Sequence, residues 1–451
     1  MNYKIGFRIK KMNNAKLKIF KTNFYIVLSY FSLIIIAFNL IFARSFVGIT
    51  LFGFRIGELE IAAGLFISLM FVVSFRKFPF SFSKDFDNIF RLIIISFIIV
   101  VVLTGSSILN TYAFKTSSYI WSVSFIFVGV LINKFIGENI NKLSPLFFTT
   151  PFIVYIMSSG NYPNFVMQFF IDYSDKFQFL KASDILIAFL ASYFLLKSSK
   201  VNRDFIVIYF FIYGSLFLPV LMKLSRGSFL GLILFLLIEG FYLKEYFKNE
   251  KRKTSILACI SILLFSLSTF RITDAEITTE SITPQTIINN VEEITKDKNT
   301  SKAFLSFYIN EYGYLDSWDP TTSWRLDIWQ DVITDMYKGD ILLTGYGYKS
   351  ILPQMLDPTA PGRLGRDGLN EHVHNYLVSI ISRGGILQFI LFTLLHLCIV
   401  RIWHRSSGNF NILAFVIPLM FVSLLDISMD GVQFPLIYYS TLGYQISKVN
   451  N

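Results

Sequence analysis

The chain alternates long apolar runs with short polar breaks. With interruptions placed at charged residues, Pro and Gly, the apolar runs fall at 24–43, 57–75, 90–111, 118–137, 145–158, 185–198, 205–223, 227–243, 254–270, 375–400, 411–426 and 431–446. Most are near twenty residues long, the length of helix that crosses a bilayer, so the pattern predicts an all-α integral membrane protein with about twelve transmembrane helices. The runs at 145–158 and 185–198 are short enough to be re-entrant or interfacial pieces instead.

One long polar segment interrupts this pattern between the ninth and tenth apolar runs. Residues 271–373 hold more than half of the chain's 30 acidic residues, together with many turn-forming Pro, Gly, Asn and Asp. The sequence therefore predicts three parts: a bundle of about nine spans at 1–270, one large extramembrane loop containing short helices at 271–373, and a bundle of about three spans at 374–451.

The most regular stretch of this loop runs from Trp324 to Tyr337. Its apolar residues recur at helical spacing: Ile328, Trp329, Val332, Ile333 and Met336. We expect an amphipathic helix that lies on the membrane surface or on the bundle. One of residues 321–323 is expected to cap its start, and a left-handed Gly339 to end it.

The opposite face of the same helix carries a row of acids, Asp327, Asp331 and Asp335. Carboxylates in such a row can offer oxygen ligands to a cation. Evenly spaced acids on one stripe of a helix are more often a solvated face, which is what we expect here.

Composition and charge distribution add the orientation. Hydrophobic residues make up 53% of the 451 residues and charged residues 16%, which excludes an ordinary soluble domain. Lys and Arg concentrate before residue 24 and at 244–253; because positive charge resists translocation, we expect both termini in the cytoplasm and the 271–373 loop outside. The formal charge of +11 then reflects topology and contact with anionic lipid, so no nucleic-acid partner is expected. The first span is too long for a cleavable signal peptide and is expected to serve as the insertion signal.

The cysteines and glycines exclude several kinds of site. Cys259 and Cys398 are the only two cysteines, and both fall inside predicted spans, so neither a disulfide framework nor a cysteine metal site is supported. The sequence has no Gly-rich phosphate loop, which argues against cytosolic nucleotide chemistry. No metal and no cofactor are expected.

Three places at the outer ends of predicted spans carry residues suited to chemistry. Arg226 lies in a Ser-Arg-Gly break between the seventh and eighth spans, and Arg325 opens the amphipathic helix. His374 and Asn375 open the tenth span, which contains Arg383. A charge at such a depth faces a cavity, pairs with another group or binds an anion. The alternatives are a snorkelling arginine and a histidine that only caps a helix.

Two acids bracket the outer end of the eleventh span, Asp426 and Asp430. Carboxylates at this depth are candidates for function, and helix-end acids exposed to water are an equal alternative. The loop also holds Trp318, Trp324 and Trp329, which are suited to sugar faces or to lipid headgroups.

In this order the elements resemble the bacterial O-antigen ligases and O-antigen polymerases, over roughly residues 220–445. The family's Ser-Arg-Gly element looks like residues 225–227, and its loop Arg with a Trp-containing helix looks like Arg325 with Trp329. Its His-Asn pair with a Gly about eleven residues on looks like 374–375 with Gly385, and its Gly-x-Gly turn is similar to 342–347. The family's second Gly, three residues further on, is Gln388 here, and we expect Gly384 to take over its packing.

The resemblance implies a glycosyltransferase C-like membrane enzyme of the bacterial inner membrane. Its donor would be a glycan on undecaprenyl diphosphate, and its acceptor a hydroxyl of a glycan or of the lipid A core at the periplasmic face, with inversion at the anomeric carbon. Membrane lipid and other polysaccharide assembly proteins are further expected partners. The acceptor class stays open among a second lipid-linked glycan, the lipid A core and a protein side chain.

The resemblance also suggests a role for each candidate residue. Arg226 and Arg325 would hold the donor diphosphate, because a guanidinium offers forked donors and stays charged. His374 would take the acceptor's proton with an imidazole poised near neutral pH. Asn375 or Asp430 would orient the ring or the acceptor; further supporting candidates are Asp426 and Arg383.

Two other classes of function remain as alternatives. A transporter or flippase of lipid-linked oligosaccharide would also use many spans and a basic cavity, and Arg383 inside a span fits it. A structural assembly protein would tolerate alanine at Arg226 and His374. The gathering of distinctive residues at one outer surface favours the transferase.

Overall fold

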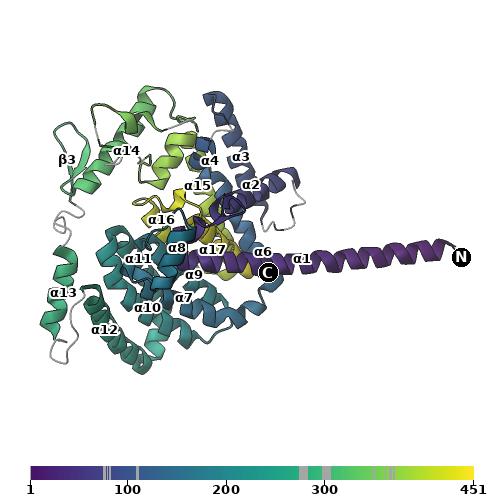
Figure 1. Ribbon diagram of the computed structural model, residues 1–451, viewed down its shortest axis with the longest axis horizontal. Coiled ribbons are helices and arrows are strands. Elements are labelled where there is room, and N and C mark those ends of the chain that lie inside the picture. Colours follow the sequence, from purple (N-terminus) through teal and green to yellow (C-terminus); the bar gives the residue numbers. More distant parts are fainter. Residues whose placement is uncertain are drawn as a thin grey trace.

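The chain folds almost wholly into helices, as Figure 1 shows. The computed structural model describes residues 2–74, 78, 80, 83–107, 111–273, 283–296, 306–348, 351–360, 362–364, 368 and 371–450. Parts of the predicted 271–373 loop, and the side chains of the basic stretch up to Lys21, lie outside this description.

The first part of the chain supplies most of the bundle. Its helices are α1 (Asn2–Val47), α2 (Ile56–Ser74), α3 (Lys84–Thr104), α4 (Thr111–Thr116), α5 (Ser118–Trp121), α6 (Ile126–Ile136), α7 (Ser144–Met157), α8 (Asn164–Tyr173), α9 (Ala182–Ser198), α10 (Arg203–Leu224), α11 (Arg226–Asn249) and α12 (Lys251–Thr273). Short 3₁₀ turns are η2 (Ser122–Phe125), η3 (Asn139–Leu143) and η4 (Ser158–Gly160). The strands β1 (Thr50–Leu51) and β2 (Phe54–Arg55) form a small antiparallel hairpin.

The rest of the chain adds the loop and the closing helices. The loop contributes α13 (Pro284–Lys296), the antiparallel pair β3 (Phe307–Ile309) and β4 (Leu315–Ser317), α14 (Pro320–Lys338) and η5 (Pro353–Leu356). The closing elements are α15 (Tyr376–Ser407), α16 (Leu413–Ser423), η6 (Ser428–Asp430) and α17 (Gln433–Asn450). In Figure 1, α14 and β3 lie above the bundle, while α13 lies beside α12.

Eight helices among the described residues are long and apolar enough to cross a membrane, which makes the chain a multi-pass membrane protein. They are Thr22–Val47, Ile56–Ser74, Lys84–Thr104, Ser118–Ile136, Arg203–Leu224, Arg226–Asn249, Lys251–Thr273 and Tyr376–Ser407. The other four of the twelve predicted spans are helices too, but α7, α9 and α16 have only 14, 17 and 11 residues.

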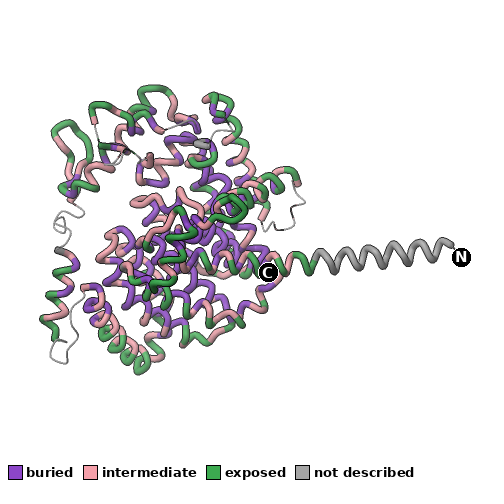
Figure 2. Tube along the Cα trace, in the orientation of Figure 1, coloured by how far each residue is buried: buried purple, intermediate pink, exposed green. Residues whose placement is uncertain are grey.

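Helices α9 and α17 lie at the centre of the bundle, where they contact other helices. Nearly every residue of these two helices is buried by other helices, as the central purple segments of Figure 2 illustrate. A Cβ added at Gly129 of α6 would lie 1.9 Å from Ser440 O of α17, and one added at Gly443 would lie 1.9 Å from Ile126 O. The two backbones therefore touch, which only glycine permits.

The loop has a small apolar core built on α14. Its buried residues are Ile328, Val332, Met336, Leu352, Met355 and Val373. The predicted amphipathic helix is confirmed, and Gly339 follows its last residue as predicted, but the predicted N-cap and the left-handed conformation of Gly339 were wrong. Asp319 caps the start, since its Oδ2 accepts a hydrogen bond from Thr322 N at 3.1 Å. At the other end Gly339 has a φ of −88°, and the left-handed residue is Asp340, with a φ of 53°.

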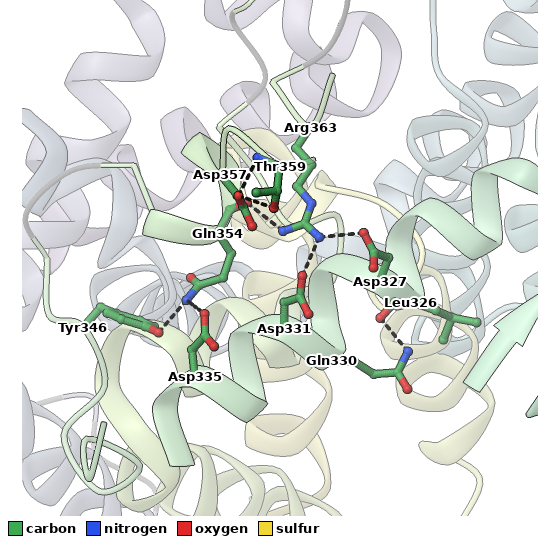
Figure 3. A network of polar contacts seen from close by, with 10 residues as sticks. All are labelled: Leu326, Asp327, Gln330, Asp331, Asp335, Tyr346, Gln354, Asp357, Thr359 and Arg363. Carbon is green, nitrogen blue, oxygen red and sulfur yellow. Dashed lines mark hydrogen bonds and ion pairs between the residues drawn. The ribbon is translucent and has the colours of Figure 1, made fainter. Parts of the chain in front are cut away.

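The aspartate stripe of α14 is largely solvated, as expected, since Asp327 and Asp335 are exposed, but it also has partners that we had not expected. Arg363, whose side chain is 3% exposed, places Nη2 2.6 Å from Asp327 Oδ2 and 2.5 Å from Asp331 Oδ2 (Figure 3). Gln354 donates to Asp335 Oδ2 at 2.9 Å. The stripe therefore docks the 351–364 segment onto α14.

Replacing Arg363 with methionine is expected to destabilise this docked segment by about 1–3 kcal/mol, because charge-assisted bonds are lost and two carboxylates face each other without a cation. Thermal unfolding in detergent, followed by proteolytic nicking of 351–364, measures the effect. Arg252→Met, at an exposed position, is the matched control. An unchanged melting temperature and unchanged nicking would contradict the docking role of Arg363.

Candidate active site

The Ser-Arg-Gly element forms the break between α10 and α11. Ser225 is extended, with φ −158° and ψ 124°, and its side chain accepts a hydrogen bond from Ser228 N at 3.4 Å. A Cβ added at Gly227 would lie 3.0 Å from the Leu425 side chain, so glycine lets the break approach the chain after α16. Arg226 is thereby held at the start of α11, where Nη1 lies 3.4 Å from Asp319 Oδ1.

Asp319 links this break to α14. Its side chain is buried, and Oδ2 accepts from Thr322 N at 3.1 Å and from Thr322 Oγ1 at 2.6 Å, while Oδ1 faces Arg226. One carboxylate therefore caps α14 and positions Arg226. The sequence analysis missed it, although an acid directly before Pro320 is a usual signal for a helix start.

Arg325 lies on the first turns of α14, close to the same carboxylate. Burial lowers the pKa of its guanidinium, whereas the Asp426 and Asp319 carboxylates raise it. Its Nε is buried and has no hydrogen-bond partner among the described residues. A buried donor without a partner is costly, and an incoming anion would satisfy it.

His374 sits on a strained turn directly before α15. Its φ is 54°, a left-handed value that is uncommon for residues other than glycine. The edge of its ring contacts Trp324, with ring centroids 5.3 Å apart, and Trp329 Nε1 donates to Val373 O at 2.6 Å. The two tryptophans of α14 therefore hold the histidine segment in place.

Burial lowers the pKa of the His374 imidazole to about 4, and the positive charge of Arg325 contributes further. This pKa lies below the neutral value that we had expected, because burial and the nearby cation both oppose protonation. The ring is neutral at physiological pH and able to accept a proton.

Asp426 completes this cluster from the segment between α16 and η6. Its Oδ2 accepts hydrogen bonds from Ser183 Oγ at 2.7 Å and Ser428 Oγ at 2.8 Å. It also acts electrostatically on both Arg325 and His374. The structure thus links Arg226 to Arg325 through Asp319, and Arg325 to His374 and Asp426, although these residues come from segments up to 200 residues apart in the sequence.

Asn375 has a local role. Its side chain is buried, and its Oδ1 accepts from Leu377 N at 3.0 Å and Val378 N at 3.1 Å. Asn375 therefore caps α15, so that the helix begins directly after the His374 turn.

The predicted Gly-x-Gly turn pairs with a break inside α15. Tyr346 N donates to Ser382 O at 2.7 Å, and Ile386 N donates to Leu342 O at 2.9 Å. Gly385 lies at this break with φ 74° and ψ 177°, and a Cβ added there would lie 2.0 Å from Leu343 O. The loop backbone therefore replaces the helical bonds that the break loses.

Gly385→Ala is expected to reduce activity at least about tenfold and to lower the melting temperature, because this conformation is nearly exclusive to glycine and the added methyl overlaps the 342–347 backbone. Gly408→Ala is the control, since Gly408 has a φ of 70° with nothing within 4 Å of an added Cβ. Glycan transfer and thermal unfolding are compared for both variants. Equal effects at the two positions would show that the loop contact is unimportant.

Gln388 and Gly384 pack together beside this break. Gln388 Oε1 accepts from Tyr348 OH at 2.7 Å and also from Tyr119 OH. A Cβ added at Gly384 would lie 1.7 Å from that same Oε1. Gly384 therefore makes room for the longer side chain.

The remaining candidates line a neighbouring pocket. Arg383 is buried, and its Nη1 donates to Gly347 O at 3.3 Å. Asp430 Oδ2 lies 3.4 Å from His372 Nδ1. Both residues line a pocket that also includes His372 and Ser382. Within the described part of the chain, no three His, Cys, Asp or Glu side chains gather as a metal site requires.

Residues 209–393 match the family model described as O-Antigen ligase. This range runs from α10 into α15, includes Arg226, Arg325 and His374, and overlaps the roughly 220–445 of the resemblance noted above from residue 220 to residue 393. No curated protein matches the sequence significantly.

Proposed function

From the match of residues 209–393 to the O-Antigen ligase family model we propose that the protein transfers a glycan from undecaprenyl diphosphate to an acceptor hydroxyl, with inversion. A glycan-transferring membrane enzyme of the ligase or polymerase type is what the family match supports. The observation that carries the finer proposal is the convergence of Arg226 and Arg325 on Asp319 beside His374.

The two arginines are suited to the departing diphosphate. Asp319 holds Arg226 at 3.4 Å, a loose pair that a diphosphate with more negative charge would replace. Arg325 contributes a buried Nε without a partner. Such preorganised donors stabilise negative charge as it develops on the leaving group.

His374 is proposed to act as the base. The donor diphosphate would offset the charge of Arg325, so we expect the pKa of His374 to rise from about 4 when the donor binds. The acceptor O–H then gives its proton to the imidazole, the acceptor oxygen bonds to the anomeric carbon, and the bond from that carbon to the phosphate oxygen breaks. Undecaprenyl diphosphate leaves with the bonding electrons on the side held by the arginines.

The site is proposed to face the periplasm of a bacterial inner membrane. It forms where α10 ends and where α11 and α15 begin, so these helices share one end there. The basic turn from Lys248 to Lys253 joins the end of α11 to the start of α12, so it lies at the end of α11 that is remote from the site. Basic turns of this kind stay in the cytoplasm. With the site on the periplasmic side, both termini of the chain are proposed to lie in the cytoplasm, as expected above.

A deletion strain tests the function and separates the acceptor classes. Loss of long glycan chains with retained single units indicates a polymerase, and accumulated lipid-linked polymer with an uncapped lipid A core indicates a ligase. Loss of glycan from a secreted protein indicates a protein O-glycosyltransferase. Purified protein that moves lipid-linked glycan across vesicles without transferring it would favour the flippase alternative.

A further inference from the structure

A second polar pocket lies beside the candidate active site. It is lined by Lys115, Glu371, His372, Arg383 and Asp430, with Ser379 and Ser382 on α15. Its enclosed part is small, about 30 Å³, and it opens into a mouth that brings the space to about 430 Å³, so a ligand would lie mainly in the open mouth. The three residues of the proposed chemistry, Arg226, Arg325 and His374, are not among its lining residues.

The chain segment 371–375 separates this pocket from the arginine cluster. His372 turns toward Asp430 and the pocket, whereas His374, two residues later, contacts Trp324 on α14. The left-handed φ of His374 accompanies this change of side. His374 therefore directly follows two residues that line the pocket, His372 and Val373, while Arg325 acts on its ring electrostatically.

The pocket contains unused hydrogen-bonding capacity. Asp430 Oδ2 is buried and accepts no hydrogen bond from the described residues, although His372 Nδ1 lies 3.4 Å away. Arg383 is 6% exposed, and its hydrogen bond to Gly347 O uses one of five N–H donors. A buried acceptor and a buried donor in one pocket fit a ligand that both donates and accepts.

The charges in the pocket balance. Lys115 Nζ lies 2.5 Å from a Glu371 carboxylate oxygen, so these two groups neutralise each other. The remaining pair, Arg383 and Asp430, has one charge of each sign. An anion would gain no net attraction here, whereas the hydroxyls of an uncharged sugar can pair with both groups.

We propose that this pocket is the acceptor subsite, in which Arg383 and Asp430 position an uncharged sugar residue whose hydroxyl reaches His374. This assignment rests on the proposed function and names the substrate class on its acceptor side. The acceptor hydroxyl, deprotonated by His374, and the diphosphate held by the arginines then lie on opposite faces of the anomeric carbon, as displacement with inversion requires. Arg383 and Asp430 are positioning residues.

Kinetics of purified protein in nanodiscs test the proposal with Asp430→Asn. The probes are the lipid-linked glycan accumulated by the deletion strain, as donor, and the decyl glycoside of the same repeat unit, as acceptor. We expect the KM for the acceptor to rise about 10- to 100-fold, and the KM for the donor to stay within about twofold. Asp340→Asn, which changes an exposed acid and suits its left-handed backbone, is the control.

Other outcomes overturn the proposal in distinguishable ways. An unchanged acceptor KM, or equal increases for donor and acceptor, contradicts the acceptor subsite. Wild-type protein that binds the donor without any transfer contradicts the proposed function itself. If Asp430→Asn does not fold, Lys115→Met at the pocket mouth replaces it, because Glu371 is then left unbalanced, and we expect a several-fold increase of the acceptor KM alone.

The charge of the sugar is tested separately by competition. A hexoside is expected to inhibit transfer competitively with the acceptor, and the corresponding hexuronide at least about fivefold more weakly, because its carboxylate meets Asp430. Stronger inhibition by the hexuronide would overturn the assignment to an uncharged sugar.

Discussion

Arg325→Met is expected to reduce kcat/KM for the lipid-linked donor about 10²- to 10³-fold, the range seen when one preorganised donor to a developing anion is removed. Methionine keeps an apolar stem in the partly buried position but supplies no charge and no N–H. The kcat/KM of Arg325→Lys is expected to lie between those of the wild type and Arg325→Met, since lysine restores the positive charge but not the forked N–H donors of a guanidinium.

The same measurement of kcat/KM tests whether Arg226 and Arg325 act together. Arg226→Met is expected to give a loss of similar size, and the double variant to lose less than the product of the single losses, because both groups act on one diphosphate. Transfer to a soluble acceptor by purified protein is the readout, and Arg252→Met serves as the control at an exposed position. Wild-type rates for Arg325→Met would remove the diphosphate role.

His374→Asn is expected to lower kcat about 10²- to 10⁴-fold, the usual contribution of general-base catalysis. Asparagine accepts a left-handed backbone, so this variant removes the imidazole while keeping the turn, whose φ is 54°. If the variant is folded and binds the donor with wild-type affinity, the loss of kcat is due to the missing imidazole and not to a change of structure.

The pH dependence gives an independent test of His374. The pKa is lowered to about 4, and protonation below it removes the base, so kcat/KM should be constant near neutrality and half lost near pH 4. The kcat profile should lose activity at a higher pH, because the bound diphosphate offsets Arg325. His404→Gln, at the other end of α15, should leave both profiles unchanged. An acidic limb of kcat/KM near the ordinary value of 6.5 would contradict the buried, neutral imidazole.

The spans were the most predictable part of the fold. A lipid-facing helix must be apolar over a fixed length, and the runs at 57–75 and 254–270 meet this requirement in the sequence itself. The short runs at 145–158 and 185–198 were ambiguous because they are shorter than the length of helix that crosses a bilayer. Helix α9 is surrounded by protein, so neither its length nor its polar residues had to satisfy a bilayer.

The loop was predictable only where local periodicity governed it. The apolar spacing from Ile328 to Met336 predicted α14, whereas its caps and the partner of its aspartate stripe were missed. Arg363 lies 32 residues from Asp331, within a segment that gives no periodic signal. A contact over that distance depends on how the chain folds back and not on spacing along it.

By itself, the sequence determined the membrane character of the chain, the order of its polar elements and the candidate residues, because bilayer thickness and helical spacing act locally. Only the tertiary structure decided that Asp319 joins Arg226 to α14, that burial beside Arg325 lowers the pKa of the His374 imidazole, and that Arg383 and Asp430 belong to a separate pocket. Those outcomes depend on desolvation, on backbone handedness at single residues and on contacts between distant segments.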